Sequence, residues 1–416
     1  MLNISMRRRI KALIVITATA ATLFAVNHIY VSNHNPHLNI EQNKINTTKI
    51  SPQRLYDYTW QLIKNEYYDP NFNNQYWARW KRKYSGKIKT SDDAKVAIET
   101  MLASLDDPYS RFLTKEEFAE QNNSITSKFS GIGVNIVSDS GKIKIISVLE
   151  NTPAEFADIK SGDIIISVND KKVSGLSLAE VSNLVKGPIN TFVNINILRD
   201  NELLMKKIIR KEITIKTVKS SIEKDIGYIQ ISSFISNSTP NEFLEALENT
   251  DKTKGLIIDL RGNTGGLLPN AVFISNLFIR NGNKIVSIVG RNGYRYDVIA
   301  QENNIDIKKP IVLLVDGSSA SASEIFSGAL KDYKRAKLIG TKTFGKGMVQ
   351  KIISMPNETG INLTIAKYLT PNGNDINKQG IQPDIEEEIT KEDILKKKDP
   401  QLEKAKTVLE NLITTK

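Results

Sequence analysis

The chain is 416 residues long, which exceeds one ordinary hydrophobic core and predicts roughly two to four folded units. Its 40% hydrophobic and 25% charged residues are typical of a globular protein. The absence of cysteine excludes disulfides, thiolate catalysis and zinc–thiolate sites. The net charge is +11, but basic residues are scattered among acidic ones rather than gathered in a stripe with aromatics, so we expect no nucleic-acid partner.

Residues 1–31 have the pattern of an export signal or a membrane anchor. Arg7-Arg8-Arg9 and Lys11 precede an uncharged apolar run from Ala12 to Val26, which continues past an Asn-His step to Val31. The run is short for a spanning helix, and no clean small-x-small cleavage site follows, so an anchor is favoured while a cleaved signal peptide stays open. The positive flank predicts that the rest of the chain lies outside the cytoplasm, in the periplasm or cell envelope.

Residues 32–50 read as an Asn-rich linker. The chain's three histidines, His28, His34 and His37, lie in this linker or just before it. A solvated linker is a poor metal site, and we expect neither a metal nor another cofactor.

Residues 51–127 show helical periodicity. Apolar side chains recur at helical spacing from Leu55 to Ile63 and again from Ala94 to Leu105. Thr114 and Glu117 have the spacing of a capping box. These patterns predict a small N-terminal helical domain.

Residues 128–212 change to short strands, with one helical stretch expected at Ser177–Lys186. The turn Gly131-Ile132-Gly133-Val134, with Thr152-Pro153-Ala154 and the run Ser161–Asn169, resembles a PDZ domain, which is mainly β. In that family the glycine loop binds the C-terminal carboxylate of a peptide, and the strand that follows pairs with the peptide. We therefore expect Gly131, Ile132, Gly133 and Val134 to bind peptide, with an ordinary glycine turn as the alternative.

Residues 213–390 alternate between strands and helices, which predicts an α/β core with a largely parallel sheet. The expected strands are Gly227–Ile231, Gly255–Leu260, Lys284–Val289, Ile311–Val315, Lys337–Ile339, Met348–Met355 and Ile361–Tyr368. The expected helices are Pro240–Leu247, Leu268–Ile279 and Ser321–Tyr333. Residues 391–416 form a helical tail that packs on the core or on a second subunit, so a homo-oligomer stays open.

A serine cluster carries the chemistry. The cluster lies just before Glu324, where a buried strand is expected to give way to a helix, and it contains Ser318, Ser319, Ser321 and Ser323. Because no histidine follows residue 37, a serine nucleophile in this cluster cannot use imidazole as its base. Lysine is the natural substitute, since an amine shielded from water by apolar walls loses its proton near neutral pH.

Lys346 is the candidate base. It lies between two glycines, and general-base duty asks its pKa to fall by roughly 2 to 3 units, which burial can deliver. Residues 346, 348 and 350 share one face of an extended chain, so the amide oxygen of Gln350 could orient the amine. Taken separately, a Ser/Ala cluster and a Gly-Lys-Gly turn are more often structural; their combination favours a Ser/Lys hydrolase.

The expected helix start favours developing negative charge. The N–H of Ala322 and an amide of the turn Asp259–Gly266 could donate to an oxyanion. We expect Glu324 to interact with the helix dipole rather than to act as an acid. Arg261 and Asp259 hold the turn or form a purely structural salt bridge.

Residues 340–346 also match the first seven positions of a Walker A loop. Gly347 replaces the Ser or Thr that binds magnesium, and the following segment reads as strand rather than helix. A phosphate-binding NTPase is therefore a weak alternative.

With these motifs assembled, the chain resembles the carboxyl-terminal processing peptidases, a PDZ-bearing family of Ser/Lys proteases. The resemblance runs from Asp107-Pro108-Tyr109-Ser110 to Gly380–Asp384 and is most specific in Gly317–Glu324, Lys331–Ala336, Thr343–Gln350 and Tyr368–Gly373. It implies a ClpP/crotonase-like core, Ser321 as the nucleophile, Lys346 as the base, Gln350 as its orienter, and Gly266 with Ala322 as oxyanion donors. It also implies cleavage near nonpolar C-termini, with the PDZ domain recruiting the substrate tail.

One departure stands out, because family members usually carry Arg-Gly-Pro where this chain has Lys186-Gly187-Pro188. Lysine cannot reproduce a bidentate arginine contact, so gating through that arginine is in doubt here. The alternative from another class is a catalytically silent PDZ adaptor that captures protein C-termini. The presence of Ser321, Lys346 and Gln350 argues against it.

Overall fold

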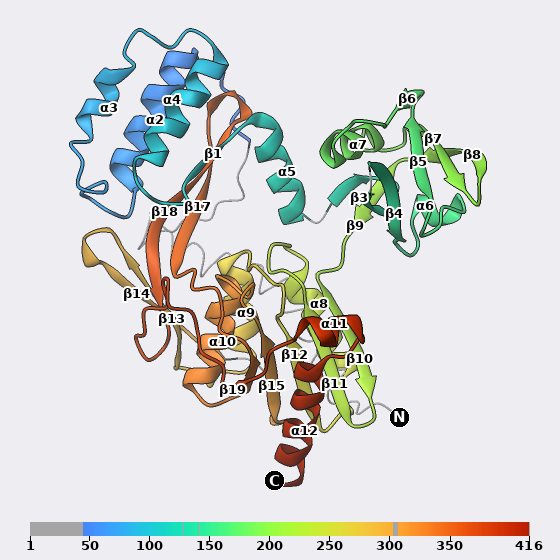
Figure 1. Cartoon of the computed structure of the whole chain (residues 1–416). Helices are drawn as coiled ribbons and strands as arrows, with labels where there is room; N and C mark the ends of the chain where they lie inside the picture. Colours follow the sequence, from blue (N-terminus) through green and yellow to red (C-terminus); the bar gives the residue numbers. More distant parts are fainter. Residues whose placement is uncertain (1–44, 127, 140, 303–306, 416) are drawn as a thin grey trace. The chain divides into compact units, whose positions relative to one another are not determined.

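The computed structural model describes residues 45–126, 128–139, 141–302 and 307–415 (Figure 1). The expected anchor at 1–31 and most of the linker lie outside the described residues. Within the described ranges, no helix is long and apolar enough to cross a membrane. The chain divides into two compact units: the described residues up to Gln121 with Thr217–Lys416 form one, and Asn122–Lys216 form the other.

The larger unit is built on a six-stranded sheet in the order β10-β11-β12-β15-β16-β19. Its strands are β10 (Val218–Glu223), β11 (Ile226–Ile231), β12 (Gly255–Asp259), β15 (Ile311–Val315), β16 (Lys337–Gly340) and β19 (Ile385–Glu386). All neighbours are parallel except the edge pair β10–β11. Every residue of β12 and β15 is buried, as the unbroken apolar runs predict for strands covered on both faces.

Helices cover both faces of this sheet. Helices α8 (Thr239–Asn249), α9 (Leu268–Asn276) and α10 (Ala322–Asp332) belong to the main core, in which Phe243, Ile274 and Phe326 are fully buried. The tail helix α12 (Pro400–Thr414), which follows the short α11 (Lys391–Leu395), packs through Ala405 and Leu409 on the other face. The tail thus packs on the core, one of the two expected alternatives.

A second, antiparallel sheet supports the N-terminal helices. It contains β1 (Arg111–Leu113), β13 (Lys284–Gly290), β14 (Arg295–Ile299), β17 (Met348–Ser354) and β18 (Gly360–Leu369), with β18 pairing to β1, β13 and β17. Helices α2 (Pro52–Glu66), α3 (Ala78–Lys83) and α4 (Ser91–Ala103) share a core with residues of β13 and β18. These helices therefore belong to the same compact unit as the α/β core.

The smaller unit contains the strands that the sequence predicts at 133–137, 143–148, 163–168 and 191–198. Its main sheet has the order β3-β4-β5-β7-β8, with β6 beside β5, and β2 pairs with β9. The strands are β2 (Lys128–Gly131), β3 (Val134–Asp139), β4 (Lys142–Val148), β5 (Ile164–Val168), β6 (Lys171–Lys172), β7 (Phe192–Arg199), β8 (Glu202–Ile209) and β9 (Lys211–Thr214). The helices are α6 (Pro153–Phe156) and α7 (Leu178–Val185), and α5 (Lys115–Thr126) leads into this unit.

Two sequence predictions need correction. The segments expected at Lys284–Val289, Met348–Met355 and Ile361–Tyr368 are strands, but all three belong to the second, antiparallel sheet and do not extend the parallel sheet. Strands β1, β2, β6, β8, β9, β10, β14 and β19 were not predicted. The capping box at Thr114 and Glu117 is confirmed: the Thr114 N–H donates to Glu117 Oε2 at 2.8 Å and the Glu117 N–H to Thr114 Oγ1 at 3.3 Å.

Candidate active site

The four clustered serines have different surroundings. Ser319 and Ser323 are fully buried, and their hydroxyls donate to the carbonyl oxygens of Leu260 and Asn263, each at 2.9 Å. Ser318 is exposed in the preceding turn. Ser321 is half-buried and takes φ 54° and ψ −114° at the residue before α10. A serine rarely adopts this backbone conformation, and such strain concentrates at functional sites.

The glycine turn after β12 lies directly against Ser321. A Cβ placed on Gly265 would stand 2.9 Å from Ser321 Cβ and 3.0 Å from the Ala322 nitrogen. The Asn263 carbonyl accepts the Ala320 N–H at 3.0 Å, which fixes the two turns to each other. Among the described residues, neither the Gly266 nor the Ala322 N–H donates to a protein acceptor. The two predicted oxyanion donors therefore belong to adjoining turns, and neither N–H is used in a hydrogen bond within the described residues.

Gly266 is held at φ 147°, where a Cβ would lie 2.2 Å from the Phe234 carbonyl carbon and the Ile235 nitrogen. Replacing Gly266 with alanine must therefore displace this turn, and we expect kcat of the predicted Ser/Lys hydrolase to fall by about 10²-fold or more. Gly262→Ala is the matched control, because Gly262 also has a positive φ, of 71°, but no atom within 4 Å of its Cβ position. Equal activity of the two variants would contradict the role of this turn.

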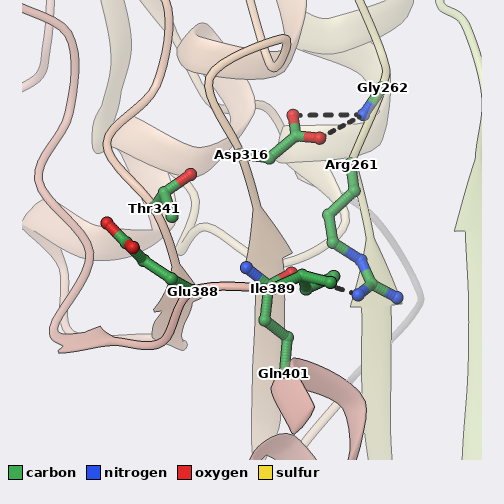
Figure 2. A pocket seen from close by; sticks show the side chains of 7 residues that line it. All are labelled: Arg261, Gly262, Asp316, Thr341, Glu388, Ile389 and Gln401. Carbon is green, nitrogen blue, oxygen red and sulfur yellow. Dashed lines mark hydrogen bonds between the residues drawn. The ribbon is translucent and has the colours of Figure 1, made fainter. Parts of the chain in front are cut away.

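Arg261 and Asp316 hold the other end of the glycine turn. The Arg261 guanidinium donates to both oxygens of Asp259 and to both oxygens of Asp399, with its shortest bond, to Asp259 Oδ2, at 2.7 Å. Figure 2 shows the Gly262 N–H donating to the Asp316 carboxylate, at 3.0 and 3.1 Å. Arg261 therefore holds the turn as well as forming salt bridges.

A shallow pocket of about 540 Å³ opens beside Arg261 and Asp316. Its lining residues come from the ends of β12, β15 and β16 and from the C-terminal segment: Arg261, Gly262, Asp316, Thr341, Glu388, Ile389 and Gln401 (Figure 2). Neither Ser321 nor Lys346 lines it. The pocket is therefore distinct from the predicted catalytic centre.

Glu324 joins the serine turn to the lysine loop. Its side chain is fully buried, and its Oε2 accepts the N–H groups of Ser321 and Lys346, each at 2.9 Å. Its Oε1 accepts the Gly345 N–H at 2.7 Å and the Thr343 hydroxyl at 2.6 Å. One carboxylate thus holds both predicted catalytic residues by their backbones, a role beyond the helix-dipole contact expected from sequence.

Tyr368 makes a second link between the same two residues. Its hydroxyl lies 3.1 Å from the Ser321 carbonyl oxygen and 2.6 Å from that of Lys346. Burial raises the pKa of this phenol well above its ordinary value, so it stays protonated as a donor. Ser321 and Lys346 are thereby brought together by two buried side chains.

The Lys346 side chain lies in an environment that disfavours its charge. Burial lowers the pKa of its amine; the nearby Asp107 carboxylate opposes this shift, and Arg111 adds to it. Its Nζ lies 4.9 Å from the centroid of the Tyr109 ring. Within the described residues, no hydrogen bond joins Lys346 Nζ to the Ser321 hydroxyl. The amine thus rests on an aromatic face.

Gln350 lies near this centre, but regular strand alternation does not place it on the same face as Lys346, as the sequence predicted. A β-bulge between Val349 and Gln350 interrupts the alternation that was to place residues 346 and 350 on one face. The Gln350 Nε2 donates to Thr364 Oγ1 of β18 at 3.3 Å, so this hydrogen bond uses the nitrogen of the amide and not its oxygen.

The loop that carries Tyr109 is fixed to the same strand. The Thr364 N–H donates to Ser110 Oγ at 3.0 Å, and Ser110 donates in turn to Asp107 at 2.6 Å. The loop of residues 107–110 and Gln350 therefore meet at Thr364. From the sequence, this loop indicates only the family resemblance, and no role at the site is predicted for it.

In the smaller unit, the predicted peptide-binding turn has a packed interior. Ile132 is buried, and Gly133 takes φ 89°, with its Cβ position 2.4 Å from the Thr152 side chain. Any larger residue would collide with Thr152, which is a structural reason for glycine there. Val134 begins β3, which in the described part of the unit pairs with β4 alone. The main sheet thus has an edge next to the predicted turn.

The Walker A alternative is excluded by the backbone. The residues after Gly347 form strand β17, whereas a phosphate-binding loop needs a helix there. Among the described residues, no group of three or more acidic or histidine side chains could hold a metal ion.

Comparison with known proteins agrees with this architecture. The PDZ domain model matches residues 130–209, and the peptidase family S41 model matches residues 225–387. The chain is 35% identical over 390 residues to the carboxy-terminal processing protease CtpA of Bacillus subtilis (strain 168), covering 92% of this chain and 78% of the relative. It is 35% identical over 344 residues to the carboxyl-terminal-processing protease of Synechocystis sp. (strain ATCC 27184 / PCC 6803 / Kazusa), covering 80% of each.

Among solved structures, the photosystem II D1 C-terminal processing protease matches with a TM-score of 0.55 and 30% identity, covering 82% of this chain and 94% of that protein. The fold and the relatives together define a serine peptidase with a PDZ domain. The chain belongs to the carboxy-terminal processing proteases of peptidase family S41. The predicted family, the enzyme class and the α/β peptidase fold with a PDZ domain are confirmed, whereas the N-terminal helices are not a separate domain but part of the larger unit.

Proposed function

We propose that this protein is a cell-envelope endopeptidase in which Lys346 deprotonates Ser321, and which cleaves protein substrates near nonpolar C-termini recruited by its PDZ domain. The observation that carries the proposal is the shared anchoring of Ser321 and Lys346 by Glu324, combined with the strained backbone of Ser321 and the lowered pKa of Lys346.

The reaction follows from these groups. The neutral amine of Lys346 takes the proton from Ser321 as Oγ attacks the scissile carbonyl carbon. The oxyanion is stabilised by the N–H groups of Gly266 and Ala322 at the N-terminus of α10. The resulting ammonium returns its proton to the leaving amine as the C–N bond breaks. Water, deprotonated by the same amine, then hydrolyses the acyl-enzyme and restores Ser321.

Because no hydrogen bond joins Lys346 Nζ to the Ser321 hydroxyl within the described residues, the amine must shift before it takes the proton. A cation over an aromatic face is stabilised in its charged form, so the contact with Tyr109 opposes the fall in pKa that burial causes. Gln350 then serves as an orienter of the amine near Ser321, since its oxygen is not the atom bound to Thr364.

Substrate recruitment is assigned to the edge strand β3 and the turn Gly131-Ile132-Gly133-Val134. An extended peptide can add to an unpaired sheet edge through backbone hydrogen bonds. The helix α7 packs beside β3, as a wall for the peptide side chains. We expect a tail with apolar side chains to bind between β3 and α7 better than a charged one.

The test is to incubate the full chain with an unstructured protein that ends in apolar residues, and with the same protein ending in acidic residues. We expect cleavage of the first, observed by mass spectrometry, and at least about tenfold lower kcat/KM for the second. An adaptor would bind the apolar tail and leave it intact. Equal cleavage of both substrates would contradict recruitment through the tail.

The activity should rise with pH. Because burial lowers the pKa of Lys346, the fraction of neutral amine grows as pH rises toward and past that pKa, and it does so at a lower pH than for an ordinary lysine. We expect kcat/KM to follow this single ionisation. A profile that stays flat from mildly acidic to alkaline pH would contradict a lysine base.

The lowered pKa of Lys346 also makes the free energy of unfolding depend on pH, in a direction that can be predicted. The folded pKa is below the unfolded one, so between the two values the unfolded chain binds more protons. The contribution of Lys346 to the free energy of unfolding therefore increases as pH rises through this window. The Lys346→Met variant should lack this increase, which urea titrations at several pH values measure.

A further inference from the structure

The chain's positive charge is concentrated in one short segment. Of the net +11, residues 78–89 carry +6 without a single acid, residues 1–44 carry +4, and all other residues together carry +1. The scattered distribution inferred from the whole sequence therefore does not hold for this segment. We call its six cations the basic surface: Arg79, Lys81, Arg82, Lys83, Lys87 and Lys89.

All six side chains of the basic surface are exposed. They lie on α3 and on the loop that follows it, among the N-terminal helices of the larger unit (Figure 1). Within the described residues, no carboxylate forms an ion pair with any of them. An anionic partner would therefore displace no existing ion pair.

Aromatic rings hold several of these cations. The Lys83 Nζ lies 4.3 Å from the centroid of the Trp80 ring and the Lys81 Nζ 5.0 Å from that of Trp60. The Arg82 guanidinium lies 5.9 Å from the ring of Tyr76, which is 69% exposed. Side chains already resting on rings lose less conformational entropy when they bind a partner.

The exposed tyrosine beside a cluster of cations is typical of a surface that meets lipid headgroups. A single-stranded nucleic acid would use several exposed aromatic rings for base stacking; Tyr76 is exposed here, but Trp60, Trp77 and Trp80 are each only 5% exposed. The chemistry therefore favours a flat anionic surface over single-stranded nucleic acid.

The start of the described chain lies in the same unit. The Asn46 N–H donates to Ser354 Oγ at 2.8 Å, and the Asn357 N–H donates to the Thr48 carbonyl at 2.9 Å. Only residues 32–44 separate this fixed segment from the expected anchor, and that length spans at most roughly 45 Å. A membrane-anchored chain would keep this unit close to the headgroups.

We propose that the basic surface binds the anionic phospholipid headgroups of the membrane that carries this protein. The proposal rests on the proposed envelope location and adds a second, electrostatic contact to it. Docking through this surface would restrict the orientation of the unit that contains Ser321.

All three tryptophans of the chain lie beside the basic surface, so their fluorescence reports on it alone. The full chain is reconstituted in vesicles that carry a headgroup spin label, made of phosphatidylcholine with or without phosphatidylglycerol. We expect stronger tryptophan quenching with phosphatidylglycerol, and loss of that difference at high salt.

The K81Q/R82Q/K83Q variant should weaken docking by about fivefold per cation removed, on the order of a hundredfold in all. The matched control is K396Q/K397Q/K398Q, which removes three exposed lysines from the α11–α12 segment and should leave quenching unchanged. Equal quenching in both vesicle types, or an equal loss in the two variants, would overturn the proposal.

Two competitors test other anions at matched ionic strength. Inorganic phosphate that abolishes quenching would indicate a free-phosphate site, and a short DNA that competes better than vesicles would indicate a nucleic-acid surface; either result overturns the proposal. Flotation with neutral vesicles tests the membrane anchor by itself. If the chain does not float with neutral vesicles, the proposed membrane location is wrong. Flotation with phosphatidylglycerol vesicles then still tests whether the basic surface binds anionic headgroups.

Discussion

Replacing Lys346 with alanine is expected to lower kcat for peptide cleavage by at least about 10³-fold, and Ser321→Ala by on the order of 10⁴-fold or more. The first change removes the base and the second removes the nucleophile, so each stops acyl-enzyme formation. Initial rates on an apolar-tailed substrate, with mass spectrometry of the products, measure both losses.

Matched controls come from the same two loops. Lys342 is an exposed lysine four residues before Lys346, and Ser318 is an exposed serine three residues before Ser321. Lys342→Ala and Ser318→Ala should keep nearly full activity. Circular dichroism and thermal melting then separate a chemical loss from an unfolded protein.

Lys346→Arg distinguishes a base from a mere positive charge. Arginine keeps the cation and can rest on the Tyr109 ring, but it stays protonated and cannot accept a proton. We expect this variant to be as inactive as Lys346→Ala. An active Lys346→Arg enzyme would show that the residue stabilises charge and that the base lies elsewhere.

Much of the fold could be predicted because it depends on local pattern. The uninterrupted apolar runs at β12 and β15 predict strands buried on both faces, and both strands are central in the sheet. The hairpin β17–β18 was assigned to the wrong sheet because its partners are remote. β18 pairs with β1 and β13, which lie far from it in sequence. Strand periodicity contains no information on such pairing.

The catalytic candidates were predicted from spacing, but their supports were not. Glu324 looks like an ordinary first-turn acid, because its partners Gly345 and Lys346 lie 21 and 22 residues further along the chain. The contact of Tyr109 with Lys346 likewise depends on a loop that only the fold brings near. Local sequence could indicate which residues react, but not what holds them.

Lys186 stands where the family usually has arginine, and the structure places another arginine beside this position, which the sequence could not reveal. Arg210 is buried beside this corner, where its Nε donates to the Val185 carbonyl at 2.8 Å. A Cβ on Gly187 would lie 2.8 Å from the same Nε. An arginine thus packs against this glycine from another strand end, 24 residues after Lys186, and serves the fold of the unit.

Glu324→Gln is expected to reduce kcat by about 10²-fold while the protein remains folded. Each Glu324 oxygen accepts two donors, so an amide NH₂ in place of one oxygen must face at least one backbone N–H. An unpaired buried N–H costs about 1–3 kcal/mol and is relieved by moving one loop away from the other. A shift of about 1 Å between Ser321 and Lys346 is enough for the expected loss of rate.

The matched control for this change is Glu242→Gln. Glu242 also accepts several donors through one oxygen, the Thr217 N–H at 2.7 Å, the Thr217 hydroxyl at 2.9 Å and the Val218 N–H at 3.0 Å, but it contacts neither predicted catalytic loop. Because all three donors bind one oxygen of Glu242, glutamine can keep its carbonyl oxygen there, so Glu242→Gln should lower the free energy of unfolding less than Glu324→Gln, and only Glu324→Gln should lower kcat. If kcat and stability fall in parallel in the two variants, Glu324 supports the fold alone, and the coupling of the serine turn to the lysine loop through its carboxylate is wrong.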